Sequence, residues 1–207
     1  MKPQVAPDHY INPSYDSKER FISYWHQINE VISLNPKEVL EIGIGNGFVH
    51  NYFKKKGVKI KTLDIDKGLN PDVVGSVLGV PFFDETFDVV ACYELLEHLP
   101  YSNFRESLKE IHRVSRKHVI LSLPDVTTIY RINIELPRIR PIKKLIPHPF
   151  HRPAQHAFNG EHYWEIGKTS YPLERIELDI RQRGLNIIKT YRVFEFYYHR
   201  FFVLEKA

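Results

Sequence analysis

The sequence predicts an α/β protein built on a mainly parallel sheet, and three observations support this. The apolar stretch "KEVLEIG" runs into a glycine-rich turn, which is followed by the helical stretch "FVHNYFKKKG" and a second strand, "VKIKTLDID". Such a unit forms parallel strands with a right-handed crossover. The alternation of helix and strand patterns then continues to "HVILSLP". Near the end, "NIIKTYRVFEF" and "HRFFVLEK" are joined by only a few residues, which requires an antiparallel pair.

Helix patterns flank this core at both ends of the chain. Apolar residues at helical spacing predict an N-terminal helix over about 16–35, capped by Asp16 or Ser17: Phe21, Trp25, Ile28 and Ile32. The helix after the glycines is expected to end at Gly57, and the stretch "YPLERIELDIRQRGL" predicts a late helix that ends at Gly184. Between them, "SNFRESLKEIHRVSR" has the apolar spacing of another helix.

A proline-rich segment over about 126–170 interrupts the alternation. Its prolines exclude long helices and central strands: Pro137, Pro141, Pro147, Pro149 and Pro153. We therefore expect an irregular cap inserted into a single domain. In this division a cofactor-binding core covers about 36–125, and a helix with a strand pair covers about 171–207.

The composition is that of an ordinary globular domain, with 43% hydrophobic residues among 207 and a net charge of +4. The single cysteine, Cys92, excludes an internal disulfide framework and is expected to serve packing. The beginning, "MKPQVAPDHYINPSYD", has no apolar stretch typical of a signal peptide, and no apolar run is long enough to cross a bilayer. We therefore expect a cytoplasmic protein. No metal site is predicted, because the later histidines match no compact zinc pattern: His148, His151, His156 and His162.

The glycines in "VLEIGIGNGF" follow the pattern G-x-G-x-G. A strand that runs into glycines and then a helix presents backbone N–H groups at the carboxyl edge of the sheet, where open α/β folds bind ligands. The dinucleotide pattern G-x-G-x-x-G would require a third glycine at Phe48. The turn therefore predicts ligand binding but departs from the dinucleotide signature.

An acid, Glu41, stands two residues before the first glycine, Gly43. A carboxylate would repel a pyrophosphate in a poorly solvated site by on the order of several kcal/mol, whereas it would attract an ammonium group. S-adenosyl-L-methionine carries an ammonium and a sulfonium group and no phosphate, so it is the cofactor that this loop predicts. Asp64, at the end of the second strand, is placed to accept hydrogen bonds from the ribose hydroxyls. The alternative is that Asp64 and Asp66 begin a polar loop, the interpretation that we favour for Asp66.

Four blocks in order, "VLEIGIGNG", "TLDID", "VPFFDETFDVVACYELLEHL" and "EIHRVSRKHVILSLP", resemble the motifs of class I S-adenosylmethionine-dependent methyltransferases, in particular the methyltransferase-11-like group. The resemblance covers roughly residues 36–125. It implies a Rossmann-like sheet of seven mostly parallel strands that ends in an antiparallel hairpin, which agrees with the strand pair at the end of the chain.

The resemblance also assigns roles around the cofactor. It places the methionine part on the loop from Glu41 to Gly47, which includes Gly43, Gly45 and Asn46. It places the ribose on Asp64 and the adenine against Ile65. Where the family commonly has an acid after the third strand, this sequence has Ser76, with Val77 beside it; a serine oxygen still accepts one hydrogen bond.

Two residues that end the fourth strand, Tyr93 and Glu94, are expected to border the sulfonium, because an aromatic face or a carboxylate suits a cation. The alternative for Tyr93 is a core position. His98, in "LLEHLP", is the candidate catalytic base, since it follows this strand and histidine titrates near neutrality. The alternative is a loop histidine that orders the site.

Candidate acceptor residues come from two later stretches. "NGEHYWEIGK" contributes His162 and Trp164, and its aromatic and charged composition suggests a substrate lid; the alternative is a structural plug in which Trp164 is buried. "YYHRFF" places Tyr198 and His199 at the turn before the last strand, where they either close the cleft or form ordinary hairpin surface.

A basic segment runs from Arg131 to Arg152, and we expect it to lie over the carboxyl edge of the sheet. Its cations suit an acidic small molecule, nucleic acid or anionic lipid, and a solvated face without a partner is the alternative. We favour an acidic or glycan-like small-molecule acceptor; nucleic acid is disfavoured because no RNA-binding module is present, and a peripheral membrane contact stays open. The predicted function is S-adenosylmethionine-dependent methyl transfer. The alternatives are a non-catalytic cofactor-binding or regulatory protein on the same fold and, more weakly, a dinucleotide enzyme.

Overall fold

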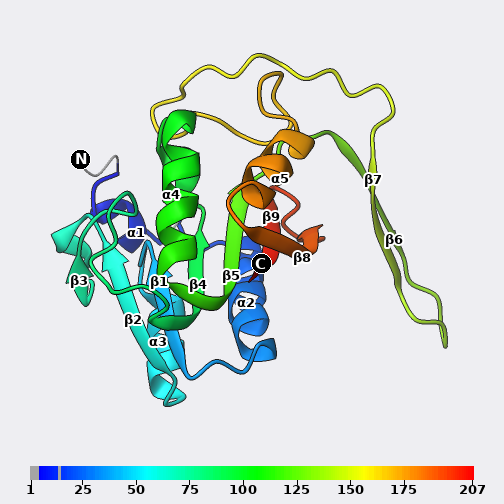
Figure 1. Ribbon diagram of the computed structural model, residues 1–207. Helices are drawn as coiled ribbons and strands as arrows, with labels where there is room; N and C mark the ends of the chain where they lie inside the picture. The colour runs from blue at the N-terminus through cyan, green and yellow to red at the C-terminus, as the bar shows by residue number, and fades with distance from the viewer. Residues whose placement is uncertain (1–4, 14) are drawn as a thin grey trace.

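The structure is a computed structural model, and it describes residues 5–13 and 15–207. Residues 1–4 and 14 lie outside the described residues. They belong to the N-terminal stretch in which we expect no signal peptide. The main sheet has seven strands in the order β3-β2-β1-β4-β5-β9-β8 (Figure 1). They are β1 (Glu38–Ile42), β2 (Lys59–Asp64), β3 (Val73–Val74), β4 (Phe87–Tyr93), β5 (Ser115–Pro124), β8 (Leu185–Arg192) and β9 (His199–Lys206).

The pairing of these strands confirms the predicted fold class. Strands β1 to β5 pair in parallel, whereas β9 runs antiparallel to both β5 and β8. The chain thus forms a Rossmann-like sheet with a reversed C-terminal hairpin. The strand order changes direction between β2-β1 and β4-β5, and such a switch point is where open α/β sheets bind ligands.

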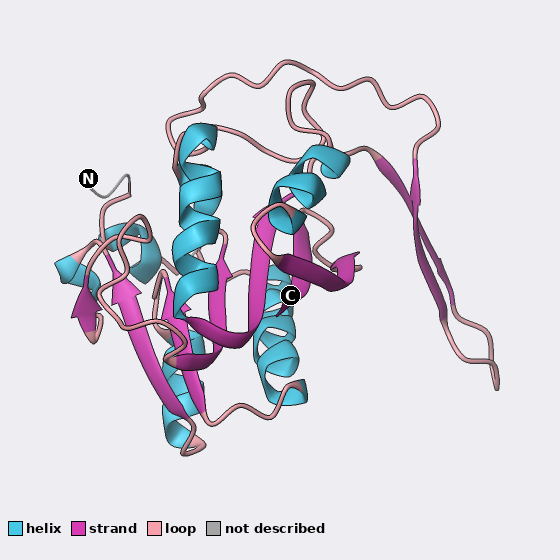
Figure 2. Cartoon of the chain, in the orientation of Figure 1, coloured by secondary structure: helices cyan, strands magenta, loops and turns pink. Residues whose placement is uncertain are grey.

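Helices cover both faces of the sheet (Figure 2). They are α1 (Asp8–Ile11), α2 (Lys18–Ser33), α3 (Phe48–Lys55), α4 (Tyr101–Val114) and α5 (Leu173–Arg181), with short 3-10 turns η1 (Lys67–Leu69) and η2 (Leu96–His98). The helix expected over 16–35 is α2, and the Ser17 hydroxyl accepts a hydrogen bond from the Arg20 N–H at 3.3 Å as its cap. Gly57 and Gly184 both have φ of +74° where the preceding helices were expected to end.

Alternating strand residues build one core on each face of the sheet. Leu40 and Val90 pack with side chains of α4 and α5, whereas their neighbours Val39 and Val89 pack with side chains of α2 and α3. This alternation is the two-residue period of a strand buried on both faces. Cys92 is 1% exposed in the α4 and α5 core, which agrees with the packing role expected for it.

The insertion differs from the irregular cap that we expected. It forms an antiparallel hairpin, β6 (Ile129–Ile134) and β7 (Ile142–Pro147), which pairs with no strand of the main sheet. Pro137 and Pro141 lie in its turn, where they remove no ladder hydrogen bond. Most of the hairpin stands away from the body of the molecule (Figure 1), but its strands contact the turn between β8 and β9, where the Lys143 Nζ lies 2.8 Å from the Glu195 carboxylate and Arg131 lies over the Phe194 ring. The basic segment therefore reaches the molecule beside this turn and does not lie over the carboxyl ends of β1, β2 and β4, contrary to our expectation.

The insertion leaves and returns at the same point, the end of β5. The Val126 N–H donates to the Ile166 carbonyl at 2.9 Å, and the Ile166 N–H donates to the Pro124 carbonyl at 3.0 Å. This closure brings the stretch around His162 back to the carboxyl edge of the sheet. Among the residues that the structure describes, no helix is both long and apolar enough to span a bilayer.

Candidate active site

A cavity of about 480 Å³ lies at the carboxyl ends of β1, β2 and β4, at the switch point of the sheet. Its volume falls within the range of roughly 300–1,000 Å³ that is usual for small-ligand sites. The N-terminal segment and α2 form one wall, and the returning insertion and the start of β9 form another. Three parts of the chain that are distant in sequence therefore enclose it.

The glycine turn forms the floor of the cavity. Gly43 has φ of +88°, which strains a residue with a side chain, and a Cβ atom there would lie 2.5 Å from Cδ1 of Leu95, so Leu95 would have to move. Its N–H donates to the Leu63 carbonyl at 2.8 Å, which ties the turn to β2. Gly45 lines the cavity, whereas Gly47 is not among the lining residues and instead begins α3 in a left-handed conformation.

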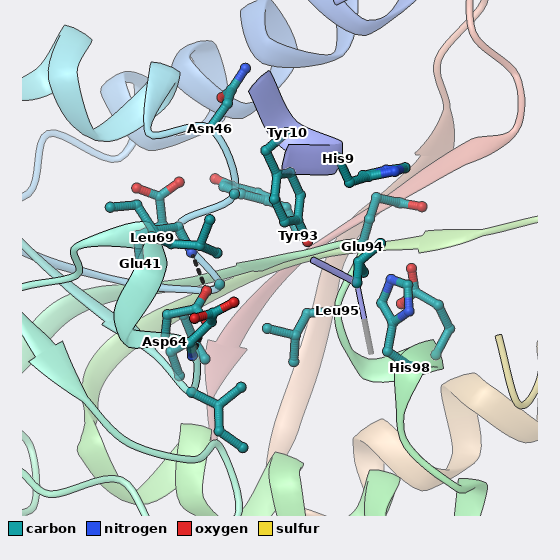
Figure 3. A pocket seen from close by; sticks show the side chains of 18 of the residues that line it. His9, Tyr10, Glu41, Asn46, Asp64, Leu69, Tyr93, Glu94, Leu95 and His98 are labelled. Carbon is teal, nitrogen blue, oxygen red and sulfur yellow. Dashed lines mark hydrogen bonds between the residues drawn. The ribbon is translucent and has the colours of Figure 1, made fainter. Parts of the chain in front are cut away.

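Asp64 ends β2 and faces the cavity beside the turn (Figure 3). Its Oδ2 accepts from the Ile44 N–H at 3.0 Å, and its Oδ1 accepts from the Asp66 N–H at 2.8 Å. Burial raises its pKa. Each carboxylate oxygen keeps a lone pair for a ligand hydroxyl. Asp66 caps η1 by accepting from the Gly68 N–H at 2.7 Å, which agrees with a polar loop there.

Residues after Asp64 and β3 line the same end of the cavity: Ile65, Ser76 and Val77. The Ser76 hydroxyl oxygen accepts a hydrogen bond from the Leu78 N–H at 3.2 Å. Its hydroxyl hydrogen is therefore directed elsewhere and can be donated to a ligand atom. This end combines an acid with apolar walls, as a nucleoside requires.

Glu41 is a buried carboxyl group whose Oε2 has no hydrogen-bond partner within the described part of the chain. It is 4% exposed and borders the cavity. Burial, followed by the nearby charge of Asp64, raises its pKa to about 8. A buried polar group without a partner is costly, and a cationic ligand group would relieve this cost.

The end of β4 forms the middle of the cavity, with Tyr93, Glu94 and Leu95 lying between Asp64 and His98 in the view of Figure 3. The Tyr93 hydroxyl donates to the Gln27 carbonyl at 3.3 Å. Glu94 has φ of +45°, a strained conformation for a residue with a side chain. Burial raises the pKa of Glu94, and its Oε1 has no hydrogen-bond partner among the residues that the structure describes.

His199 lies in the wall behind Glu94, with its Nε2 3.6 Å from the Glu94 Oε2. Its Nδ1 is 2.8 Å from the Ser23 hydroxyl, and the side chain is almost fully buried. Burial lowers the pKa of His199 to about 3, so the ring is neutral near pH 7. His199 therefore serves the cavity as a fixed, uncharged wall.

Glu97 and His98, both in η2, border the opposite end of the cavity. Glu97 is 0% exposed, and burial raises its pKa well above the usual value. Among residues 5–13 and 15–207, neither of its carboxyl oxygens has a hydrogen-bond partner. The His98 Nδ1 lies 3.1 Å from the Glu161 carbonyl. Burial, followed by the proximity of His162, lowers the pKa of His98 to about 4, so the ring is neutral at physiological pH.

A hydrogen-bonded network links the returning insertion with the start of β9. The His162 Nδ1 lies 3.0 Å from Oε1 of Glu165, and the Tyr198 hydroxyl donates to the same oxygen at 2.7 Å. These contacts lower the pKa of Glu165 to about 2, with His162 as the first cause. A permanently ionised carboxylate thus orients the His162 ring, the arrangement that fixes the tautomer of many catalytic histidines.

Trp164 does not line the cavity, although we expected it to contact substrate. It is 0% exposed, its Nε1 donates to the Leu99 carbonyl at 3.1 Å, and its ring packs edge-on against Tyr101 and Phe104. An indole ring buries a large apolar area once its N–H has a partner, which explains this position. Trp164 therefore anchors the stretch that carries His162. This agrees with the alternative in which Trp164 is a buried structural plug.

The sequence reasoning missed the N-terminal contribution to the cavity, which includes Tyr10, Tyr15 and Arg20. The Arg20 guanidinium lies 3.9 Å from the centre of the Tyr15 ring, and its Nε donates to the Tyr15 carbonyl at 2.8 Å. Asn46, from the glycine loop, donates to the Tyr24 hydroxyl at 2.9 Å and joins this segment to the site. The one available signal was the tyrosine-rich stretch "DHYINPSYD" ahead of a capped helix.

The side chains of Glu97, His98 and His162 each place a possible ligand atom within 4.8 Å of the other two. The spacing of the histidines in the sequence gave no sign of such a group, because His98 and His162 come from different segments. Acidic and imidazole groups of this kind suit proton transfer as well as a cation.

Residues 40–123 match the protein family described as a methyltransferase domain. The ubiquinone biosynthesis O-methyltransferase of Stutzerimonas stutzeri is 29% identical over 113 residues, which are 47% of this chain and 44% of that protein. An uncharacterized methyltransferase of Schizosaccharomyces pombe is 30% identical over 135 residues, 59% of this chain and 51% of that protein. The chain spans about half or less of the length of the curated relatives that it matches.

Among solved structures, the Burkholderia thailandensis 1,6-didemethyltoxoflavin-N1-methyltransferase, with bound 1,6-didemethyltoxoflavin and S-adenosylhomocysteine, superposes with a TM-score of 0.59. It is 14% identical, and the match covers 100% of this chain and 93% of that chain. The chain therefore has the fold of the class I S-adenosylmethionine-dependent methyltransferases. Residues 40–123 thus match the kind of methyltransferase domain that the sequence motifs resemble.

Proposed function

We propose that this protein is an enzyme that transfers a methyl group from S-adenosylmethionine to a small, uncharged amine or hydroxyl acceptor. The observation that supports this most is the number of carboxyl groups in the cavity. Six carboxyl side chains line it: Glu41, Asp64, Asp66, Glu94, Glu97 and Glu161. Burial raises the pKa of Glu41, Glu94 and Glu97, and a bound cation would favour the charged form of each. Among the described lining residues, Arg20 is the one lysine or arginine. Such a cavity favours a ligand with positive centres and disfavours a polyphosphate.

The residues present fit the cofactor from one end of the cavity to the other. Asp64 would accept hydrogen bonds from the ribose hydroxyls, with the adenine against Ile65 and beside Ser76 and Val77. Glu41 would pair with the ammonium group, which its partnerless oxygen supports. Arg20 would pair with the carboxylate. When bound, S-adenosylmethionine supplies an electrophilic methyl group on a sulfonium centre.

The chain's own part in the reaction is mainly alignment and proton removal. Tyr93 and Glu94 lie where they would border the sulfonium, and an aromatic face or a carboxylate stabilises a cation. His98 stays a candidate base, but its pKa of about 4 makes it a weak one near neutrality. The arrangement favours His162 as the base, because the Glu165 carboxylate would stabilise the imidazolium that forms.

The acceptor end does not support the acidic acceptor that we expected. That expectation rested on basic residues over the carboxyl edge, whereas the hairpin that carries them contributes no residue to the cavity lining. The groups that do lie there are Glu97, Glu161, His98 and His162. Their character favours a neutral nucleophile that must lose a proton, such as an amine or a hydroxyl group.

Incubation of the purified protein with methyl-labelled S-adenosylmethionine and fractionated cell extract tests the proposal. We expect label to appear in a small-molecule fraction. Tight cofactor binding with no transfer to any fraction would instead favour the alternative, a non-catalytic cofactor-binding or regulatory protein.

Glu41 gives a prediction for the pH dependence of cofactor binding. Its pKa of about 8 means that it is mostly protonated in the free protein at pH 7, and a bound ammonium group would expel the proton. Affinity for S-adenosylhomocysteine should therefore rise as pH increases toward that pKa, with about one proton released per ligand at pH 7. Calorimetry in buffers of different ionisation enthalpy measures this release.

Two controls belong to this experiment. Adenosine, which lacks the amino acid, should bind without proton release. The variant Glu41→Gln should bind S-adenosylhomocysteine more weakly and without release. Unchanged proton release in Glu41→Gln would assign the titration to another group and remove Glu41 from the ammonium site.

A further inference from the structure

We propose that the β6–β7 hairpin is a docking element for an anionic membrane surface. Its strands pair only with each other among the described residues, and it extends from the body of the molecule (Figure 1). Neither the cavity nor the proposed chemistry uses it. An isolated two-stranded hairpin is marginally stable in water, so an apolar face on it calls for a cover.

One face of the hairpin is almost entirely apolar. Residues opposite each other in an antiparallel pair share a face, and the register pairs Tyr130 with Ile146 and Ile134 with Ile142. These four side chains are between 41% and 51% exposed. Ile132, opposite Lys144, lies between the two pairs on the same face. The face is therefore apolar and open along its length.

The turn of the hairpin carries the same combination of groups. Leu136 and Ile139 are 53% and 58% exposed, and they alternate with Arg138 and Arg140. Apolar tips with neighbouring long cationic side chains suit the boundary of a bilayer, where the apolar groups enter and the charges stay at the headgroups.

The charge of the hairpin decides among the possible occupants. Residues 129–147 hold five cations, Arg131, Arg138, Arg140, Lys143 and Lys144, against one acid, Glu135. Their net charge of +4 equals that of the whole chain, so the remainder is neutral. Lys143 pairs with Glu195 at 2.8 Å and Arg131 lies over the Phe194 ring, so the attraction falls mainly to the exposed cations Arg138, Arg140 and Lys144. A second copy of the hairpin would bring like charges together. A nucleic acid would neutralise the cations but leave the apolar face uncovered, whereas anionic lipid satisfies both.

Flotation with lipid vesicles tests this docking element in the full chain. We expect binding to vesicles of phosphatidylcholine mixed with phosphatidylglycerol, weakened by salt, and little binding to phosphatidylcholine alone. The variant Arg138→Gln/Arg140→Gln should lower the partition coefficient by roughly 30-fold, since each cation near the surface contributes about 1 kcal/mol. The matched control Lys54→Gln/Lys55→Gln removes the same charge from exposed positions on α3 and should have a much smaller effect.

The apolar contribution has its own pair of variants. Leu136→Ser/Ile139→Ser should weaken vesicle binding, whereas Phe83→Ser, which changes a side chain that is 90% exposed elsewhere, should not. Equal losses in hairpin and control variants, or no binding to anionic vesicles, would overturn the proposal. The proposal would also be overturned if the wild-type protein formed a dimer in light scattering, or bound RNA, and the hairpin variants abolished that dimer or that binding. Binding of S-adenosylhomocysteine without vesicles is measured in parallel, so failure here is distinct from failure of the proposed function.

Discussion

Replacing His162 with alanine is expected to lower the rate of methyl transfer by about a hundred- to ten-thousandfold, the usual contribution of a positioned general base. The Glu165 carboxylate holds the His162 ring through Nδ1 at 3.0 Å, so the ring is oriented before an acceptor arrives. Affinity for S-adenosylhomocysteine should stay nearly unchanged, because the proposed cofactor contacts come from other residues. Single-turnover transfer of labelled methyl to the acceptor found in extract, with calorimetry for binding, measures both quantities.

Two companion variants separate the candidate bases. Glu165→Gln keeps the shape of the side chain but removes the charge that would stabilise the imidazolium, so transfer should also fall. His98→Ala should have the smaller effect, because a base with a pKa of about 4 is poorly matched to neutral pH. If His98→Ala abolishes transfer and His162→Ala does not, the two assignments must be exchanged.

Replacing Asp64 with alanine is expected to weaken the binding of S-adenosylhomocysteine by about 1 to 3 kcal/mol, the loss associated with hydrogen bonds to a charged group. This corresponds to roughly a 5- to 150-fold rise in the dissociation constant. The reason is that Asp64 is the acid that ends β2 beside the turn, with lone pairs left over after its contacts to Ile44 and Asp66. Calorimetry measures the change.

Asp64 also supports the glycine turn, so its variants need a control for folding. Asp64→Asn retains an oxygen acceptor and should bind the ligand with intermediate affinity. Far-ultraviolet circular dichroism and thermal unfolding show whether each variant is folded. Wild-type affinity in a folded Asp64→Ala protein would mean that the ribose does not contact this residue.

Local patterns predicted the parts of the fold that depend on neighbouring residues. The turn at Gly43 follows from a strand, closely spaced glycines and a helix within one short stretch, and the short β8–β9 connection requires an antiparallel pair. Asp64 and Tyr93 border the cavity because strand ends meet at one edge of a parallel sheet. Such features need no knowledge of tertiary packing.

The other parts of the site depend on contacts that are remote in sequence. Arg20 enters the cavity through the packing of α2 against the sheet, and Glu165 meets Tyr198 only because the insertion closes back on β5. The sequence suggested that the Trp164 ring contacts substrate. Its position is instead determined by burial against α4 and by the carbonyl that accepts a hydrogen bond from its N–H. The orientation of the β6–β7 hairpin relative to the main sheet likewise depends on tertiary packing, and the prolines in the sequence do not specify that packing.

The proposed function depends on a cavity whose carboxyl groups select a cationic nucleoside without phosphate, and ligand competition in the calorimeter tests this most directly. S-adenosylhomocysteine and NADH are first titrated separately into the wild-type protein. Each is then titrated into the protein in the presence of the other. The account predicts that S-adenosylhomocysteine binds, that NADH alone gives no heat of binding, and that NADH does not reduce the affinity for S-adenosylhomocysteine. Binding of NADH with no binding of S-adenosylhomocysteine would contradict the assignment.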